Sequence, residues 1–286
     1  MTIAQTYTLS HDQAHLEVVP GRGGIITRWQ VAGQDLLYLD QERFADPSLS
    51  VRGGIPILFP ICGNLPNNEF HHHGQVYSLK QHGFARDQAW EVNQQTANSL
   101  TLSLSHNPAT LSQYPFPFVL ELIYTLTATS LTLATTLHNP GPTDLPFSFG
   151  FHPYFQIANK SALELVIPAT TVTDQKNQIT TPFVGRFDWT APELDLAFRP
   201  LAQPQAQVIN AATGTTLTLD FSPDYSTLVF WTIAGKDYVC VEPWTAPRNA
   251  LNTGEDLLKV SPGGAWQGEF KLTVTPNSSG FIHSYK

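Results

Sequence analysis

The sequence predicts an all-β protein, and three observations support this prediction. Apolar and polar residues alternate with a period of two in many short segments, as they do along half-buried strands. Charged residues make up only 13% of the chain, whereas the exposed faces of long helices usually need Glu, Lys and Arg. The 22 prolines and 19 glycines supply ample turn residues. Apolar stripes of helical period and length are absent from the sequence.

The alternating segments define the expected strands along the chain. Residues 118–127 (FVLELIYTLT) and 131–138 (LTLATTLH) flank a short turn at 128–130, which predicts a β-hairpin. Residues 194–198 are expected to form at most a single helical turn. The other expected strands show the same alternation and cover residues 100–105, 163–167, 215–221, 227–233, 238–241 and 269–275.

The domain organisation follows from the even distribution of these strands. No flexible linker, charge block or repeat divides the chain, so we expect one domain over residues 1–286. That many strands predict either two large antiparallel sheets packed face to face or a closed barrel. Loop-rich stretches at 41–87, 140–156 and 242–257 are the expected carriers of function, because functional residues concentrate in loops on rigid sheets.

Charge and composition argue against several kinds of partner. A net charge of −8 without a basic stripe argues against binding nucleic acid. No apolar run reaches the roughly 20 residues of a membrane-spanning helix, and the N-terminal segment lacks the features of a signal peptide. We therefore expect a cytoplasmic protein without nucleic-acid or membrane partners, monomeric or weakly dimeric. Cys62 and Cys240 sit in apolar runs, which favours buried free thiols.

Two residues stand in settings suited to acid–base chemistry. His152 lies among aromatic residues in FSFGFHPYF, where it is either a core histidine bonded to backbone or a general acid in an apolar cleft. Glu242 ends an apolar strand in YVCVEPW, where it is either a surface residue or a base whose pKa is adjusted by partial burial.

Three further polar residues lie close to glycine-rich bends. Arg52 precedes GGIPILFP, and His82 and Arg86 share the segment QHGFARDQAW. Each of them taken alone reads equally well as an ordinary loop residue. Their combination with His152 and Glu242 favours a common site.

Other motifs point to no metal or phosphate-loop chemistry. The adjacent histidines at 71–73 do not converge easily on one ion, so we expect a solvated loop there and no metal site. The GRGG segment at 21–24 lacks the later Gly-Lys-Ser/Thr of a phosphate loop and is expected to be a turn. No serine occupies a nucleophile-elbow motif.

Five segments together resemble the aldose 1-epimerase, or galactose mutarotase-like, family. They occur in the family's order, and FGFHPYF and LKQHGFAR are the more specific of them. RGGIP together with HGFAR also resembles the branch that acts on hexose 6-phosphates. The segments are RGGIPILFPICG (52–63), LKQHGFAR (79–86), FGFHPYF (149–155), ELDLAF (193–198) and VCVEPWTAPRNALNTGEDLLKVSPGG (239–264).

The resemblance implies an antiparallel β-supersandwich with a sugar cleft on one sheet, and it implies residue roles. Glu242 would be the catalytic base and His152 the acid, with His82 assisting at the ring oxygen or the anomeric hydroxyl. Arg52 and Asp195 would bind sugar hydroxyls, although Asp188 competes with Asp195 for this role.

The remaining implied roles concern the sugar's phosphate and its ring face. Arg86 would join Arg52 at a phosphate if the substrate carries one. An aromatic residue such as Trp244 or Phe151 would stack against the sugar. The implied enzyme is an isomerase that needs no cofactor.

The chemistry expected of such an enzyme is reversible ring opening. The base removes the proton of the C1 hydroxyl while the acid protonates the ring oxygen, and rotation about C1–C2 precedes reclosure. Three interpretations stay open: an epimerase of a free aldose, the same reaction on a hexose 6-phosphate, and a non-catalytic carbohydrate-binding protein. A glycosidase built on Asp195 and Glu242 would leave both histidines without a role.

Overall fold

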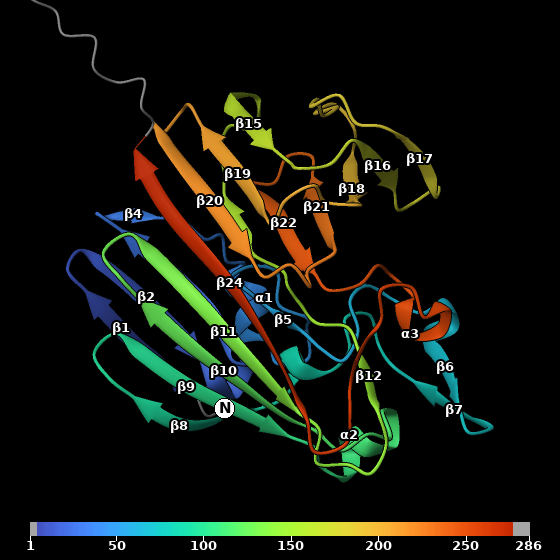
Figure 1. Ribbon diagram of the computed structural model, residues 1–286. Coiled ribbons are helices and arrows are strands. Elements are labelled where there is room, and N and C mark those ends of the chain that lie inside the picture. Colours follow the sequence, from blue (N-terminus) through green and yellow to red (C-terminus); the bar gives the residue numbers. More distant parts are fainter. Residues whose placement is uncertain (1–4, 277–286) are drawn as a thin grey trace, which may run out of the picture.

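Two eight-stranded antiparallel sheets form the body of the protein (Figure 1). The structure, a computed structural model, describes residues 5–276. Its helices are short: α1 (Gln41–Ala45), α2 (Pro108–Gln113) and α3 (Ala250–Thr253), with single turns of 3-10 helix elsewhere. None of the helices among the described residues is long and apolar enough to cross a membrane. The all-β prediction is confirmed, in the form of sheets rather than a closed barrel.

The first large sheet, called sheet 1, contains the long central strands that the sequence predicted. Alternation decides its packing, because every second residue of strand β10 is buried in the core. The predicted hairpin is β10–β11, with Leu126 paired to Leu131 at its end. In spatial order the strands are β15 (Leu163–Val166), β19 (Gln205–Asn210), β20 (Thr215–Phe221), β24 (Ala265–Pro276), β11 (Ser130–His138), β10 (Val119–Leu126), β9 (Ser99–Ser105) and β8 (Glu91–Gln95).

The second large sheet, called sheet 2, carries the residues singled out for chemistry. In spatial order its strands are β17 (Ile179–Pro182), β16 (Thr171–Asp174), β18 (Glu193–Phe198), β21 (Thr227–Ile233), β22 (Tyr238–Trp244), β13 (Gly150–Phe151) and β5 (Ile57–Leu58), while β14 (Tyr154–Gln156) also pairs with β22. Apolar side chains from both large sheets belong to one buried core cluster.

Smaller sheets complete the described chain. A four-stranded sheet uses the N-terminal segment, where no strand was expected: β1 (Tyr7–His11), β2 (Ala14–Val19), β3 (Ile25–Val31) and β4 (Gln34–Asp35). Two-stranded ladders join β12 (Leu145–Phe147) to β23 (Leu258–Val260), and β6 (Glu69–His72) to β7 (Gln75–Ser78).

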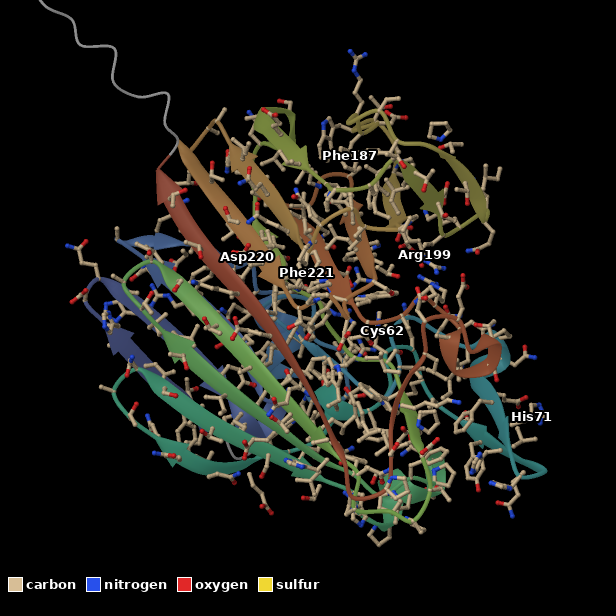
Figure 2. All side chains as sticks on the ribbon, in the orientation of Figure 1. Cys62, His71, Phe187, Arg199, Asp220 and Phe221 are labelled. Atoms are coloured by element: carbon tan, nitrogen blue, oxygen red, sulfur yellow. The ribbon has the colours of Figure 1, made fainter. Side chains whose placement is uncertain are left out.

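Two expectations about local structure were wrong. Residues 194–198 belong to strand β18 and form no helical turn, because ELDLAF alternates polar and apolar residues; Leu194 and Leu196 pack against the core. The histidines at 71–73 lie in the hairpin β6–β7 and not in an irregular loop. His71 is exposed on this outer hairpin, whereas Cys62 is buried inside the protein (Figure 2). Both cysteines are buried and free, as predicted.

Candidate active site

Strand β22 presents Glu242 to a cleft on the outer face of sheet 2. Successive side chains of a strand point to opposite faces, and Val239 and Val241 enter the main core. The side chains on the other face of the strand are Tyr238, Cys240, Glu242 and Trp244. A carboxyl group therefore sits, only 1% exposed, in a strand that is buried along its whole length.

His152 lies directly across from Glu242 because of the strand register. Antiparallel pairing joins Gly150 to Trp244 and Tyr154 to Cys240, which leaves His152 opposite Glu242. The ladder is interrupted at His152, whose backbone N–H donates to the carbonyl of Pro56 at 3.0 Å. The result is a close pair of side chains, with Nε2 of His152 3.4 Å from Oε1 of Glu242.

Neighbouring rings hold this pair in place. The indole Nε1–H of Trp244 donates to Oε2 of Glu242 at 3.2 Å, so each carboxyl oxygen has a different partner. The ring of Tyr154 stacks on the ring of His152, with centroids 4.7 Å apart and planes 10° apart. Trp244 is 1% exposed and lies beside the carboxyl group, which suits it to orient Glu242 more than to stack on a sugar.

Burial shifts the pKa values of the pair toward the neutral forms. Desolvation raises the pKa of Glu242 well above its ordinary value, and the nearby charge of Asp195 adds to this effect. Desolvation lowers the pKa of His152 to about 3, with a further contribution from the positive charge of Arg86. Burial therefore favours the arrangement in which the carboxyl group, and not the imidazole, carries the proton.

The raised pKa of Glu242 predicts that Glu242→Gln becomes more stable than the wild type as pH rises. Folding raises the pKa of Glu242 above its unfolded value of 4.5. The contribution of Glu242 to the free energy of unfolding is therefore complete below pH 4.5 and is lost as pH rises through the pKa of the folded state. Gln cannot ionise in the unfolded state and avoids that loss. We expect the variant to gain about 1 kcal/mol over the wild type at neutral to alkaline pH, a usual size for a stabilising change at a functional site.

The measurement is urea unfolding at several pH values from acid to alkaline. Glu193→Gln is the matched control. The hydrogen bond to Lys176 lowers the pKa of Glu193, so this substitution should decrease the stability at neutral pH where Glu242→Gln increases it. A Glu242→Gln variant whose stability falls with alkaline pH as steeply as the wild type would contradict the assignment of a raised pKa.

His82 approaches the pair from a sharp bend. The next residue, Gly83, has a φ of 69°, and a Cβ there would lie 2.3 Å from the carbonyl oxygen of Phe59. The backbone N–H of Gly63 donates to Nδ1 of His82 at 3.1 Å, which leaves Nε2 of a neutral ring as a hydrogen-bond donor. Burial, and then the charges of Arg86 and His152, hold the pKa of His82 well below its ordinary value. The ring centroids of His82 and His152 are 5.5 Å apart.

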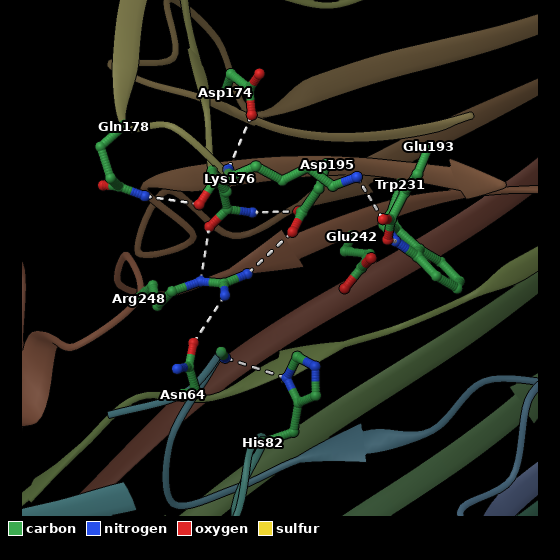
Figure 3. A network of polar contacts seen from close by, with 12 residues as sticks. Asn64, His82, Asp174, Lys176, Gln178, Glu193, Asp195, Trp231, Glu242 and Arg248 are labelled. Carbon is green, nitrogen blue, oxygen red and sulfur yellow. Dashed lines mark hydrogen bonds and ion pairs between the residues drawn. The ribbon is translucent and has the colours of Figure 1, made fainter. Parts of the chain in front are cut away.

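Asp195 reaches the cleft from strand β18 and is fixed by a polar network (Figure 3). Gln175 donates to Oδ1 of Asp195 at 2.7 Å, and Arg248 donates to Oδ2 at 3.3 Å. Arg248 also donates to Gln175 at 3.1 Å and to Asn64 at 2.7 Å. Burial raises the pKa of Asp195, while Arg248 and Gln175 oppose the shift. The competing candidate, Asp188, caps its own turn through Thr190 and does not line the cleft.

Four arginines border the cleft, and two of them were predicted. Arg52 is exposed, with its guanidinium 5.9 Å from the ring centre of Trp231. Arg86 lies deeper and donates to the carbonyl of Gln81 at 2.8 Å. Its Nε is buried without a hydrogen-bond partner, and no carboxylate among residues 5–276 forms an ion pair with it. Arg43, on α1, and Arg248 are the other two and were not predicted.

The cleft has a volume of about 390 Å³ and gathers every polar residue proposed from the sequence except Asp188. Sequence reasoning missed Trp231, Glu193 and Arg248. Trp231 occupies the same alternating face of β21 as Val229, and its Nε1–H donates to Glu193 at 2.8 Å. The cleft lining comprises Arg43, Ser50, Val51, Arg52, Gln81, His82, Arg86, His152, Tyr154, Glu193, Asp195, Val229, Trp231, Glu242, Trp244 and Arg248.

Comparisons with known proteins agree with this architecture. The structure is similar to that of the Slr1438 protein from Synechocystis sp. PCC 6803, with 49% identity, a TM-score of 0.94, and coverage of 97% of this chain and 99% of that one. A galactose mutarotase related enzyme from Lactobacillus acidophilus shares the fold at 22% identity and a TM-score of 0.79, with 97% and 100% coverage.

The sequence comparisons show the family. The chain matches the family model described as aldose 1-epimerase over residues 5–273. It is 25% identical to the chromosomal LacX protein of Lactococcus lactis, over 80% of this chain and 88% of that protein. It is 26% identical to a protein of Cenchrus ciliaris provisionally named a glucose-6-phosphate 1-epimerase, over 90% and 80%. The chain therefore belongs to the aldose 1-epimerase family, whose members are isomerases.

Proposed function

We propose that the protein interconverts the α and β anomers of a hexose by acid–base ring opening at the Glu242–His152 pair. The observation that carries this proposal is the 3.4 Å approach of a carboxyl group and an imidazole at the floor of a cleft on sheet 2. Such a pair supplies one proton acceptor and one proton donor, which is what transfer between O1 and O5 of a pyranose requires.

The protons balance within this pair. With the shared proton on His152, the Glu242 carboxylate accepts the proton of the C1 hydroxyl while His152 donates to the ring oxygen, and the C1–O5 bond breaks. The pair is then left with its proton on Glu242, the form that burial favours in the empty cleft. Rotation about C1–C2 and the reverse transfers close the ring as the other anomer.

The neighbouring residues would orient the sugar during these transfers. His82, a neutral donor through Nε2, would hydrogen-bond the ring oxygen or the anomeric hydroxyl. Asp195, fixed by Arg248 and Gln175, would accept hydrogen bonds from sugar hydroxyls. Arg52 would donate to hydroxyls at the mouth of the cleft.

The proposed function is tested by measuring the rate of anomer exchange of a panel of sugars at several protein concentrations. The rate should rise with protein concentration for at least one of these sugars. A protein that binds sugars without accelerating exchange would instead be the non-catalytic carbohydrate-binding protein considered above. One domain over residues 1–286, a cytoplasmic location and a monomeric or weakly dimeric state stay predictions.

A specific observation favours a hexose 6-phosphate as a second candidate substrate. Arg86 is half-buried with its Nε enclosed, borders the cleft and forms no ion pair with a carboxylate among the described residues. A partly buried guanidinium without a counter-ion gains from a ligand that supplies one, and phosphate is a natural bidentate ligand of Arg. Arg52 and Arg43 border the same cleft and would add positive charge.

The phosphate hypothesis predicts that Arg86→Ala damages activity on glucose 6-phosphate selectively. A charge-assisted hydrogen bond contributes about 1.5–3 kcal/mol, so its loss would lower kcat/KM roughly ten- to hundredfold. Activity on glucose should fall much less. The measurement compares kcat/KM on both sugars in the wild type and in the variant, so that a general structural defect cancels.

Arg199→Ala is the matched control, since Arg199 pairs with Glu255 and Asp256 away from the cleft. It should leave the ratio between the two substrates unchanged. A wild type that prefers glucose, or an Arg86→Ala variant that loses equally on both sugars, would restrict the proposed function to free aldoses.

A further inference from the structure

A thiol lies beside the proposed catalytic pair and takes no part in the reaction described above. Cys240 is two residues before Glu242 on β22 and shares its face of the strand. One ring nitrogen of His152, Sγ of Cys240 and a carboxylate oxygen of Glu242 all lie within 4.8 Å of one another. All three residues are buried. We propose that these three side chains form an inhibitory binding site for a thiolate-preferring divalent cation such as Zn²⁺ or Cd²⁺.

The spacing of the pair suits a metal ion better than a strong hydrogen bond. Charge-assisted hydrogen bonds between nitrogen and oxygen usually measure about 2.7–2.9 Å, whereas His152 and Glu242 are 3.4 Å apart. Zinc binds histidine nitrogen and carboxylate oxygen at about 2.0–2.2 Å, which places two ligands of a tetrahedron roughly 3.4 Å apart. The nitrogen and oxygen are therefore already at the edge length of a tetrahedral site.

The donor set selects the class of metal. Nitrogen, oxygen and sulfur together favour zinc and its softer analogue cadmium, while the oxygen-preferring ions Mg²⁺ and Ca²⁺ gain little from a thiolate. Three protein ligands leave the fourth position of a tetrahedral site for an exchangeable ligand, as in catalytic zinc sites. Binding releases the proton shared by the pair and the proton of the thiol, so two anionic ligands balance the two charges of the metal.

The surroundings of the three ligands are rigid and partly enclosed. Tyr154 stacks on His152, and Tyr154, Tyr238 and Cys240 form one buried cluster. Nδ1 of His152 is buried and has no hydrogen-bond partner among the described residues, so the stacking on Tyr154, and no bond at Nδ1, orients the ring. His152 and Glu242 line the cleft, which supplies the route of entry.

Metal binding at this site would block the reaction assigned to the pair. Coordination would occupy the lone pair of the imidazole nitrogen that carries the transferred proton, and a metal-bound carboxylate is a much weaker base. The inhibition rests on the proposed function, but metal binding does not. Metal binding is measured separately, by absorbance.

The experiment titrates the full-length protein with Cd²⁺ and records the thiolate-to-metal absorption band in the ultraviolet. The wild type should show the band, and Cys240→Ser should lose it. The matched control is Cys62→Ser, which removes the other cysteine of the chain and should retain the band. Surface histidines such as His71 coordinate metal without producing a sulfur band.

Two further measurements keep the proposal falsifiable if Cys240→Ser folds poorly. Glu242→Gln retains the thiol and should bind Cd²⁺ at least about tenfold more weakly, because even outer-sphere partners of a metal are worth about 10–100-fold in affinity. Zn²⁺ should inhibit anomer exchange by the wild type, with activity restored by a chelator. Where Cys240→Ser does fold, it should stay active and need at least about tenfold more Zn²⁺ for the same inhibition.

A sulfur band that persists in Cys240→Ser, or that disappears in Cys62→Ser, would overturn the proposal. So would equal Cd²⁺ affinity in Glu242→Gln and the wild type. An inactive wild type that still shows a Cys240-dependent band would refute the proposed function and leave the metal site standing.

Discussion

Replacing Glu242 with Gln should lower kcat for anomer interconversion by about 10²–10⁴-fold, the usual contribution of one positioned proton transfer. Gln keeps the shape of the side chain and can accept the hydrogen bond from Nε1–H of Trp244. It cannot take up the C1 hydroxyl proton. Polarimetry on freshly dissolved α-glucose measures the loss directly.

Binding of the sugar should survive this change. Calorimetric titration of Glu242→Gln is expected to give a dissociation constant close to that of the wild type, because the cleft contacts of Asp195 and Arg52 are unchanged. Glu193→Gln is the matched control, since Glu193 also lines the cleft but bonds to Trp231 and Lys176. Near wild-type rates in Glu242→Gln would remove Glu242 from the role of base.

The second large effect is expected at His152. His152→Asn should lower kcat by about 10²–10⁴-fold while raising KM much less, because an acid acts mainly in the transition state. Asn retains hydrogen-bonding capacity but cannot deliver a proton to the ring oxygen. Initial rates over a range of sugar concentrations separate kcat from KM.

His106→Asn is the matched control, because His106 is a half-buried histidine that bonds to the backbone of Phe118 outside the cleft. It should leave both kinetic parameters unchanged. A His152→Asn variant with normal kcat and raised KM would make His152 a binding residue. One with normal kinetics and early melting would make it a core residue.

The central sheet could be predicted from sequence because its signal is local. The alternation in LELIYTL and LTLATTL determines which side chains enter the core. Alternation of apolar and polar residues indicates a strand even when the neighbouring strands of the sheet are unknown. The segment ELDLAF shows the limit of this reasoning. Its alternation is equally clear, yet residues 194–198 were expected to form at most a single helical turn, and they lie in strand β18.

The site depends on pairings that no local pattern contains. His152 lies opposite Glu242 because the short strands β13 and β14 both pair with β22 in the same register. This pairing joins residues that are 90 positions apart in the sequence. Arg248 contacts Asn64 across 184 residues of sequence, and neither residue was singled out beforehand. The family resemblance placed Glu242, His152, His82 and Asp195 in one cleft, and the contacts among them come from the structure alone.

Burial also changes the protonation states expected from sequence. The expected reactive form has Glu242 ionised and His152 protonated, yet desolvation shifts both pKa values toward the uncharged forms in the empty cleft. The number of protons on the pair is the same in both cases. Sugar hydroxyls that hydrogen-bond the carboxylate would stabilise its charged form when substrate binds.

The central claim is that this protein accelerates anomer exchange at the Glu242–His152 pair, and exchange spectroscopy by NMR tests it most directly. The anomeric protons of α- and β-glucose, and of the 6-phosphate, are followed at equilibrium with wild type, Glu242→Gln and His152→Asn. The account predicts an exchange rate that rises in proportion to wild-type concentration and falls nearly to the buffer rate in both variants. A wild type that binds these sugars while exchange stays at the buffer rate would contradict it.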